Sequence, residues 1–158
     1  MISVSHTTSH AIRALACLAG CADPPASIKD VAACADVPQA YLAKIVKKLN
    51  DSGIIESKRG HKGGIWLARP AKLISLLEIC IALEGDDFLG TCLLGSECCS
   101  DDRDCPTHQF WMKNRELIRR EFDRIKLSDV LAFYRERGLH HMPTVEELAG
   151  SGLPFASE

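Results

Sequence analysis

The order of short elements in the N-terminal half constrains the fold of this chain more than any other feature of its sequence. Ser27 followed by Asp30 is a capping-box pattern, which predicts a short helix over Ile28–Ala35. A three-residue break follows, and Pro38 suits the first turn of a second helix. The apolar side chains of this second helix share one face and its lysines lie toward solvent. The pattern is therefore helix, turn, helix.

Two short strands are predicted after this helix pair, at 54–57 and 65–67. The segment between them, 58–64, contains three glycines and three cationic side chains. Glycines favour a tight turn, and a basic hairpin in this place is typical of a wing. We therefore expect a mainly α fold with a small β-hairpin, in which a winged helix-turn-helix DNA-binding domain precedes a long C-terminal dimerisation helix.

Positive charge is concentrated in this part of the chain. The formal net charge of the whole sequence is −2, but residues 39–72 carry eight basic and two acidic side chains, a local net charge of +6. A concentrated positive field attracts phosphates, so the overall charge does not exclude DNA as a partner. The first turn of the second helix is expected to face base edges, and the wing to contact phosphates or the minor groove. The candidate DNA-binding residues are Gln39, Ala40, Tyr41, Lys44, Lys47, Lys48, Arg59, His61 and Lys62.

Three further amphipathic helices are predicted, over 9–21, from Ser75 as N-cap to Glu84, and over His108–Ile125. The last carries an apolar stripe that suits packing against a partner chain, formed by Trp111, Ile118, Phe122 and Ile125. The expected organisation is a DNA-binding domain at 1–84, a cysteine-rich cofactor loop at 85–107, a dimerisation helix region at 108–135 and a tail at 136–158.

A cytoplasmic location is expected, because the sequence has no apolar run of about 18 residues and no signal-peptide pattern at its start. A membrane partner is therefore not expected. An enzyme is disfavoured, since no serine–histidine–aspartate order, phosphate loop or paired-carboxylate motif is present.

Four of the eight cysteines lie in the acidic segment 85–107, close to His108. A disulfide framework is not expected in a reducing compartment, which favours metal or redox roles for thiols. Thiolates bind iron–sulfur clusters, zinc and copper(I), and a nearby imidazole can complete a three-cysteine site. Spacing alone does not distinguish a cluster from zinc. The remaining cysteines lie in helical patterns and are expected to be small buried hydrophobes without a functional role: Cys17, Cys21, Cys34 and Cys80.

The segments 40–49, 53–55 and 59–64 resemble the recognition helix and wing of the Rrf2 family of transcription regulators. The resemblance extends over roughly residues 3–135 and includes the cysteines that follow the wing. Members of this family regulate iron–sulfur cluster assembly or sense nitric oxide. The resemblance implies a homodimer whose long C-terminal helices cross between subunits, and whose wings each contact half of a near-palindromic operator in double-stranded DNA.

The same resemblance implies a [2Fe–2S] or [4Fe–4S] cluster bound by three loop cysteines, and Cys92, Cys99 and Cys105 match the family spacing. Cys98 gives an alternative register. His108 corresponds to the histidine that some members use as a fourth ligand. Other members take that ligand from the first helix of the partner subunit, which makes His10 a second candidate.

We therefore expect a transcription regulator, such as a repressor, that senses redox state, iron or nitric oxide through this cluster. Two alternatives remain open. One is a winged-helix regulator that binds zinc or uses metal-free thiol–disulfide chemistry at Cys98 or Cys99. The other is an iron–sulfur electron carrier, which would leave the basic wing unexplained.

Overall fold

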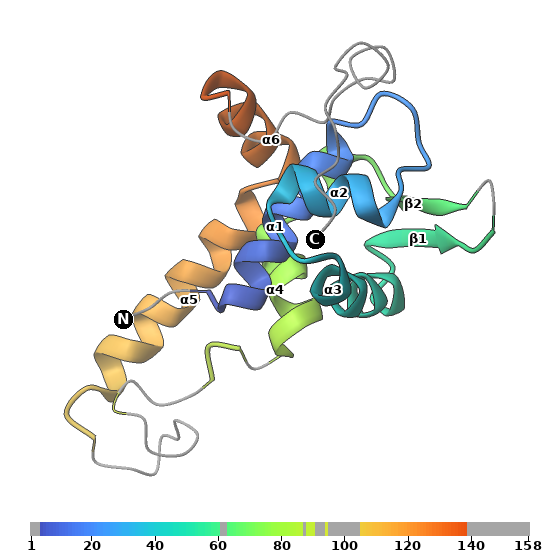
Figure 1. Cartoon of the computed structure of the whole chain (residues 1–158). Helices are drawn as coiled ribbons and strands as arrows, with labels where there is room; N and C mark the ends of the chain where they lie inside the picture. The colour runs from blue at the N-terminus through green and yellow to red at the C-terminus, as the bar shows by residue number, and fades with distance from the viewer. Residues whose placement is uncertain (1–3, 61–62, 87, 91–93, 95–104, 139–158) are drawn as a thin grey trace.

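The computed structural model describes residues 4–60, 63–86, 88–90, 94 and 105–138. Within these ranges the chain is mainly helical and has one two-stranded sheet, as predicted (Figure 1). The elements in chain order are α1 (His6–Ala19), α2 (Ile28–Ala35), α3 (Gln39–Asp51), β1 (Ile55–Lys58), β2 (Gly64–Leu67), the short 3-10 helix η1 (Ala71–Leu73), α4 (Leu76–Glu84), α5 (His108–Arg124) and α6 (Leu127–Glu136). None of the helices in the described ranges combines the length and apolarity that crossing a bilayer requires.

The hydrophobic core surrounds α1, which packs against α2, α3, α4, α6 and β2. Leu15 of α1 is almost fully buried, as are Leu42 and Ile45 of α3. Leu127, the first residue of α6, belongs to the same core. The hairpin projects on one side of this core and α5 runs along the opposite side (Figure 1). The helix-turn-helix, the hairpin base and α6 therefore share one apolar core.

Serine N-caps begin three of the helices. Ser75 and Glu78 form a complete capping box at the start of α4. At α2, the Ser27 hydroxyl oxygen accepts the Asp30 N–H but its own proton goes to the Asp30 carboxylate, at 2.7 Å, so the reciprocal backbone bond of the predicted capping box is not formed. Ser5 caps α1 through the N–H of Thr8. The helix starts predicted at Ser27 and Ser75 are confirmed.

The turn between α2 and α3 is closed by the backbone. Asp36 adopts a left-handed conformation with φ of 51° at the end of α2. The N–H of Val37 donates to the carbonyl of Ala32, and the Val37 side chain is buried. This hydrogen bond, the left-handed Asp36 and the buried Val37 together end helix α2. Pro38 lies just before α3 as its N-cap, one position earlier than predicted.

The hairpin pairs β1 with β2, with Ile55 opposite Leu67 and Lys58 opposite Gly64. The strands lie within one residue of the predicted positions. Ala26 pairs with the other edge of β2 through two backbone hydrogen bonds with Ile65, of 3.0 and 2.8 Å. A Cβ atom at Gly64 would lie 2.5 Å from the Ala26 carbonyl oxygen, so the close approach of Ala26 to the start of β2 requires glycine at this position. The hairpin is thereby joined to the residue before the N-cap of α2.

The predicted helix over His108–Ile125 is followed by a second helix, α6. The backbone is extended at Ile125 and Lys126, where the N–H of Leu76 donates to the Ile125 carbonyl and the N–H of Leu127 donates to the Ile74 carbonyl. These bonds engage backbone groups that a continuous helix would need for its own ladder. The helix over 108–124 agrees with the prediction, whereas α6 was not predicted as a separate element.

Part of the apolar stripe expected to contact a partner chain packs within its own chain. Trp111 is 5% exposed, and α5 packs against α4. Phe122 stacks against Phe88, with 6.3 Å between ring centroids. The exposed apolar side chains of α5 are Phe110 and Leu117, at 61% and 57% exposure. Ile118, Phe122 and Ile125 are half-buried, so the expected contact of the stripe with a partner chain stays a prediction.

The interpretation of Cys17 and Cys34 as unpaired thiols is wrong. Their sulfur atoms form a disulfide between α1 and α2. Helical packing brings their Cα atoms to 6.2 Å, within the range that a disulfide needs, although they are 17 positions apart in the sequence. Cys80, in contrast, is a buried free thiol as expected, and burial, followed by the charge of Glu84, raises its pKa to about 12. Cys21 is also free and half-buried.

Candidate nucleic-acid interface and cysteine loop

A groove of about 660 Å³ separates the exposed side of α3 from the hairpin. The first residues of α2 form one end of it, and the glycines of the hairpin form another part of its wall. The Ser57 hydroxyl donates to the Asn50 side-chain oxygen at 3.0 Å, which fixes β1 on the last turn of α3. This hydrogen bond thus fixes the position of the hairpin relative to α3, on the opposite side of the groove.

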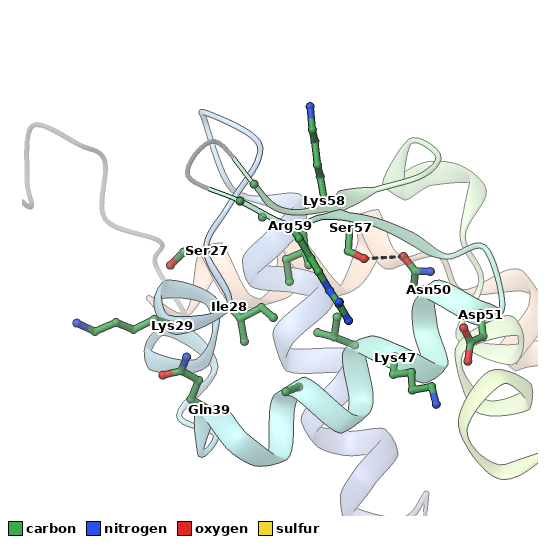
Figure 2. A pocket seen from close by; sticks show the side chains of 16 residues that line it. Ser27, Ile28, Lys29, Gln39, Lys47, Asn50, Asp51, Ser57, Lys58 and Arg59 are labelled. Atoms are coloured by element: carbon green, nitrogen blue, oxygen red, sulfur yellow. Dashed lines mark hydrogen bonds between the residues drawn. The ribbon is translucent and has the colours of Figure 1, made fainter.

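Three of the predicted DNA-binding residues line this groove: Gln39, Lys47 and Arg59. Figure 2 shows Arg59 extending from the hairpin toward α3, while the neighbouring Lys58 side chain points the other way. Gln39 lies at the start of α3 and Lys47 two turns later. Ala40 and Lys44 are exposed on the same helix but outside the groove lining. His61 and Lys62 lie outside the described residues.

Tyr41 and Lys48 make contacts on other sides of α3. The Tyr41 hydroxyl shares a hydrogen bond of 2.6 Å with Thr7 of α1, and its ring meets His10 edge-on. The Lys48 ammonium donates to the carbonyl of Leu83, at 3.1 Å, near the end of α4. A cation at that position stabilises the carbonyls left without helical partners. These contacts hold α3 against α1 and α4.

Sequence reasoning missed the contribution of α2 to the groove. Ser27, Ile28 and Lys29 line it together with α3 and the hairpin. Figure 2 shows the Lys29 side chain extending outward from this end. The predicted N-cap at Ser27 was the available signal, because it located the start of α2. Only the folded chain shows that this start lies beside the hairpin.

The end of α4, where the predicted cysteine loop begins, is bonded to α1. Glu84 accepts the backbone N–H of Ser5 at 3.0 Å and the hydroxyl of Thr8 at 2.6 Å. Burial raises the pKa of Glu84, but the hydrogen bonds from Thr8 and Ser5 lower it by more, so it lies below its ordinary value of 4.5. Glu84 is therefore held as a carboxylate at the junction between α1 and α4.

Described residues just before the loop cysteines lie against α5. The Arg119 guanidinium donates to the Asp86 carbonyl at 3.4 Å, and the Phe88 ring stacks on Phe122. Leu89 is buried. Asp86 and Phe88 are thus held against the second half of α5.

Two of the four predicted metal ligands are described. Cys105 is a half-buried free thiol whose sulfur lies 3.3 Å from the Thr107 hydroxyl. His108 is the first residue of α5, and its backbone N–H donates to the Cys105 carbonyl at 3.0 Å. Cys92, Cys99 and the alternative Cys98 lie outside the described residues. Among the residues that the structure describes, no three His, Cys, Asp or Glu side chains are grouped to hold a metal ion.

His10, the second candidate for a fourth ligand, lies on α1 beside Tyr41. Its Nδ1 atom is buried and has no hydrogen-bond partner among the described residues. The thiol of Cys105 and the imidazoles of His108 and His10 are donors that suit an iron–sulfur cluster or zinc. The donor chemistry of the described residues therefore fits the implied cofactor.

Comparison with known proteins gives a family match over most of the chain. The Rrf2 family, described as an iron-dependent transcriptional regulator, matches residues 4–132. A helix-turn-helix-type transcriptional regulator of Aquifex aeolicus is 31% identical over 130 residues, which span 80% of this chain and 90% of that protein.

Two solved structures are similar over most of their length. IscR of T. potens has a TM-score of 0.68 and 25% identity, and the match covers 89% of this chain and 93% of that chain. CymR, the global cysteine regulator of B. subtilis, has a TM-score of 0.70 and 23% identity, with 84% of this chain and 98% of that chain covered. The similarity to CymR shows a shared fold.

Proposed function

The chain belongs to the Rrf2 family of transcription regulators, and from that premise we propose that it binds operator DNA through the groove between α3 and the hairpin. The observation that carries this proposal is the placement of Lys47 and Arg59 on two walls of one groove. A duplex approaching that groove would meet cations from both α3 and the wing, which suits contact with phosphates.

Different residues of the interface have different tasks in this proposal. Gln39, Ala40 and Lys44 lie in the first turns of α3, where a recognition helix contacts base edges in the major groove. Lys47 and Arg59 contact phosphates, as do His61 and Lys62, which follow Arg59 in the sequence. Tyr41 and Lys48 set the orientation of α3 through Thr7 and the Leu83 carbonyl.

Adjacent lysines test this division. Replacing Lys47 with Ala should weaken binding to all duplexes alike and reduce the slope of log affinity against log salt by about 0.9, because one phosphate contact is lost. Arg59→Ala should behave in the same way. Lys48→Ala is the matched control for the salt slope: because its cation bonds to the Leu83 carbonyl, its loss should leave that slope unchanged even where the affinity falls. The measurement is fluorescence anisotropy with a duplex selected by the protein from a randomised library.

Base contacts have a different signature. Gln39→Ala should change the preferred sequence, at a cost of about 1–3 kcal/mol for the original operator. Binding that is indifferent to Gln39, Lys47 and Arg59 would contradict the proposed interface.

We further propose that Cys92, Cys99 and Cys105, with His108 as fourth ligand, hold an iron–sulfur cluster of the [2Fe–2S] or [4Fe–4S] type. Cys98 is the alternative to Cys99, and His10 the alternative to His108. When bound, the cluster supplies a redox-active group that oxidation, nitric oxide or iron loss can alter. Support comes from the donor set at the start of α5 and from the similarity to IscR.

Residues of this chain offer a route from the cysteine loop to the DNA-binding groove. Asp86 and Phe88 contact α5, and Glu84 bonds to Ser5 and Thr8 of α1. One residue earlier, the Leu83 carbonyl accepts Lys48 of α3. A change in the loop that shifts the end of α4 would therefore act on α3 directly, which suits a ligand-controlled switch.

Single cysteine variants test the cluster. Protein purified without air should be brown and contain sulfide, and Cys92→Ala, Cys99→Ala or Cys105→Ala should abolish the visible absorption. Cys21→Ala is the control that keeps the colour. Cys98→Ala distinguishes the two registers, because loss of colour in that variant would assign the ligand to Cys98. Protein that takes up zinc alone and binds its operator equally before and after chelation would contradict the cluster.

The regulator is proposed to act in the cytoplasm as a homodimer on a near-palindromic operator. The argument for a second copy is the apolar surface of α5, where Phe110 and Leu117 lie seven positions apart and are exposed. Residues at this spacing share one helix face, so two copies could bury it between them.

A further inference from the structure

The disulfide between Cys17 and Cys34 has no part in the function proposed above. It joins the last turn of α1 to the last turn of α2, inside the domain that carries the helix-turn-helix. Cys17 is 1% exposed, whereas Cys34 is only partly buried. The two sulfur atoms of one bond are therefore unequally accessible from solvent.

The position of Cys34 connects this bond to the recognition helix. Helix α2 ends at Ala35, one residue after Cys34, and the short turn over 36–38 leads to Gln39 at the start of α3. The other end of α2 lines the groove through Ser27 and Lys29. The cross-link thus fixes α2 to the core helix α1. Helix α2 in turn sets the start of α3 and forms one end of the groove.

A DNA-binding regulator works in the compartment that holds the DNA. In cells that keep this compartment reducing, disulfides are rare and those that occur are usually transient or redox-sensing. We propose that Cys17–Cys34 is a reversible redox centre, opened by a dithiol that attacks Cys34, and that its closed form holds α2 and the 36–38 turn in the geometry that binds DNA. The effect on DNA rests on the function proposed above.

The chemistry is a two-step thiol–disulfide exchange. A thiolate of the dithiol bonds to Sγ of Cys34, the Cys34–Cys17 bond breaks, and Cys17 leaves as a thiolate and takes up a proton. The second thiol of the same dithiol then attacks the dithiol sulfur in this mixed disulfide. The dithiol closes into a ring disulfide, and Cys34 is released as a thiol. Two electrons and two protons pass to the protein, and the dithiol becomes a disulfide. A disulfide oxidant reverses the sequence.

The test uses the full chain with Ser at Cys92, Cys98, Cys99 and Cys105, so that no response can come from the cysteine loop. Dithiothreitol is the reductant, and peptide mass spectrometry after alkylation locates each thiol. Reduction should make both Cys17 and Cys34 open to alkylation, with Cys34 modified first. Amide hydrogen exchange over 30–38 should then accelerate by about tenfold or more, because the cross-link no longer restrains α2.

Affinity for a duplex selected by the oxidised protein should fall by about fivefold or more on reduction, since the binding geometry is no longer preorganised. Cys34→Ser should bind as weakly as reduced protein and ignore dithiothreitol. Cys21→Ser, which changes a free cysteine one turn beyond Cys17, should respond as its parent does.

Three outcomes would overturn the inference. They are a native disulfide that dithiothreitol does not open, unchanged exchange over 30–38 after opening, and equal affinity in both states. If hydrogen exchange responds as expected but neither the variant chain of this test nor the wild-type chain selects any duplex from a randomised library, the DNA-binding function is overturned and the redox centre is retained.

Discussion

The winged-helix part of the chain and helix α5 differ in how they are stabilised. Each of α1, α2, α3 and α4 buries at least three side chains in the described structure. Helix α5 is the longest element, with 17 residues, yet Trp111 is its one buried side chain among those described. The winged-helix part therefore completes its core within one chain, whereas α5 leaves apolar surface for another contact.

The surface ion pairs of α5 contribute too little to make up for its few buried side chains. The ion pairs Arg120–Glu116 and Arg124–Glu121 on α5 are exposed, and such pairs each contribute a few tenths of a kcal/mol. Burial of one apolar side chain is worth about 1.5–3 kcal/mol. A second copy covering Phe110 and Leu117 would stabilise α5 more than its own charge pairs do.

The largest expected effect separates a core leucine from a surface leucine. Leu15→Ala should lower the free energy of unfolding by about 2–5 kcal/mol, because Leu15 is 1% exposed and its removal leaves a cavity. Leu117→Ala should change it by about 0.5 kcal/mol or less in urea titrations at concentrations too low for dimers. Equal losses in the two variants would show that α5 has a core of its own.

An intermediate effect concerns association. Phe110→Glu combined with Leu117→Glu should weaken self-association by about tenfold or more, because charges would replace the apolar face. Sedimentation velocity measures the shift, and circular dichroism checks that the fold is retained. Leu73→Glu is the matched control, since Leu73 is 55% exposed on η1, away from α5. An unchanged dimer in the double variant would place the interface elsewhere.

The smallest expected effect lies within the winged-helix part, at Glu84, where the end of α4 bonds to α1. Its pKa is lower in the folded state than its ordinary value, so the unfolded chain binds the proton more readily. The stabilisation is therefore present above the ordinary pKa and is lost as pH falls through the lowered one. Because Glu84 is largely exposed, we expect less than about 1 kcal/mol from it.

Thermal unfolding between neutral pH and about pH 3 measures this contribution. Glu84→Gln should flatten the acid limb of the stability curve. Thr8→Val, which removes the hydroxyl donor at similar volume, should flatten it in part. A Glu84→Gln curve that follows the wild type would show that the bonds to Ser5 and Thr8 do not stabilise the fold.

Much of the winged helix was predictable because its signals are local. The caps at Ser27 and Ser75, the break before α3 and the glycine-rich basic turn each depend on residues a few positions apart. The candidate groove residues Gln39, Lys47 and Arg59 followed from the same patterns. The lysines of α3 show the limit, since Lys47 and Lys48 are equivalent in the sequence but one lines the groove and the other bonds to α4.

The sequence by itself determined the order of the α-helices and strands up to α5, the charge of the hairpin and the family. Tertiary structure decided which face of α5 stays exposed, how α5 is joined to a further helix and which cysteines meet. The break at Ile125 depends on backbone bonds to the residues around Ser75. The pairing of Cys17 with Cys34 depends on the packing of α1 on α2. Each of these outcomes arises from contacts between residues far apart in the chain, which local periodicity and spacing do not encode.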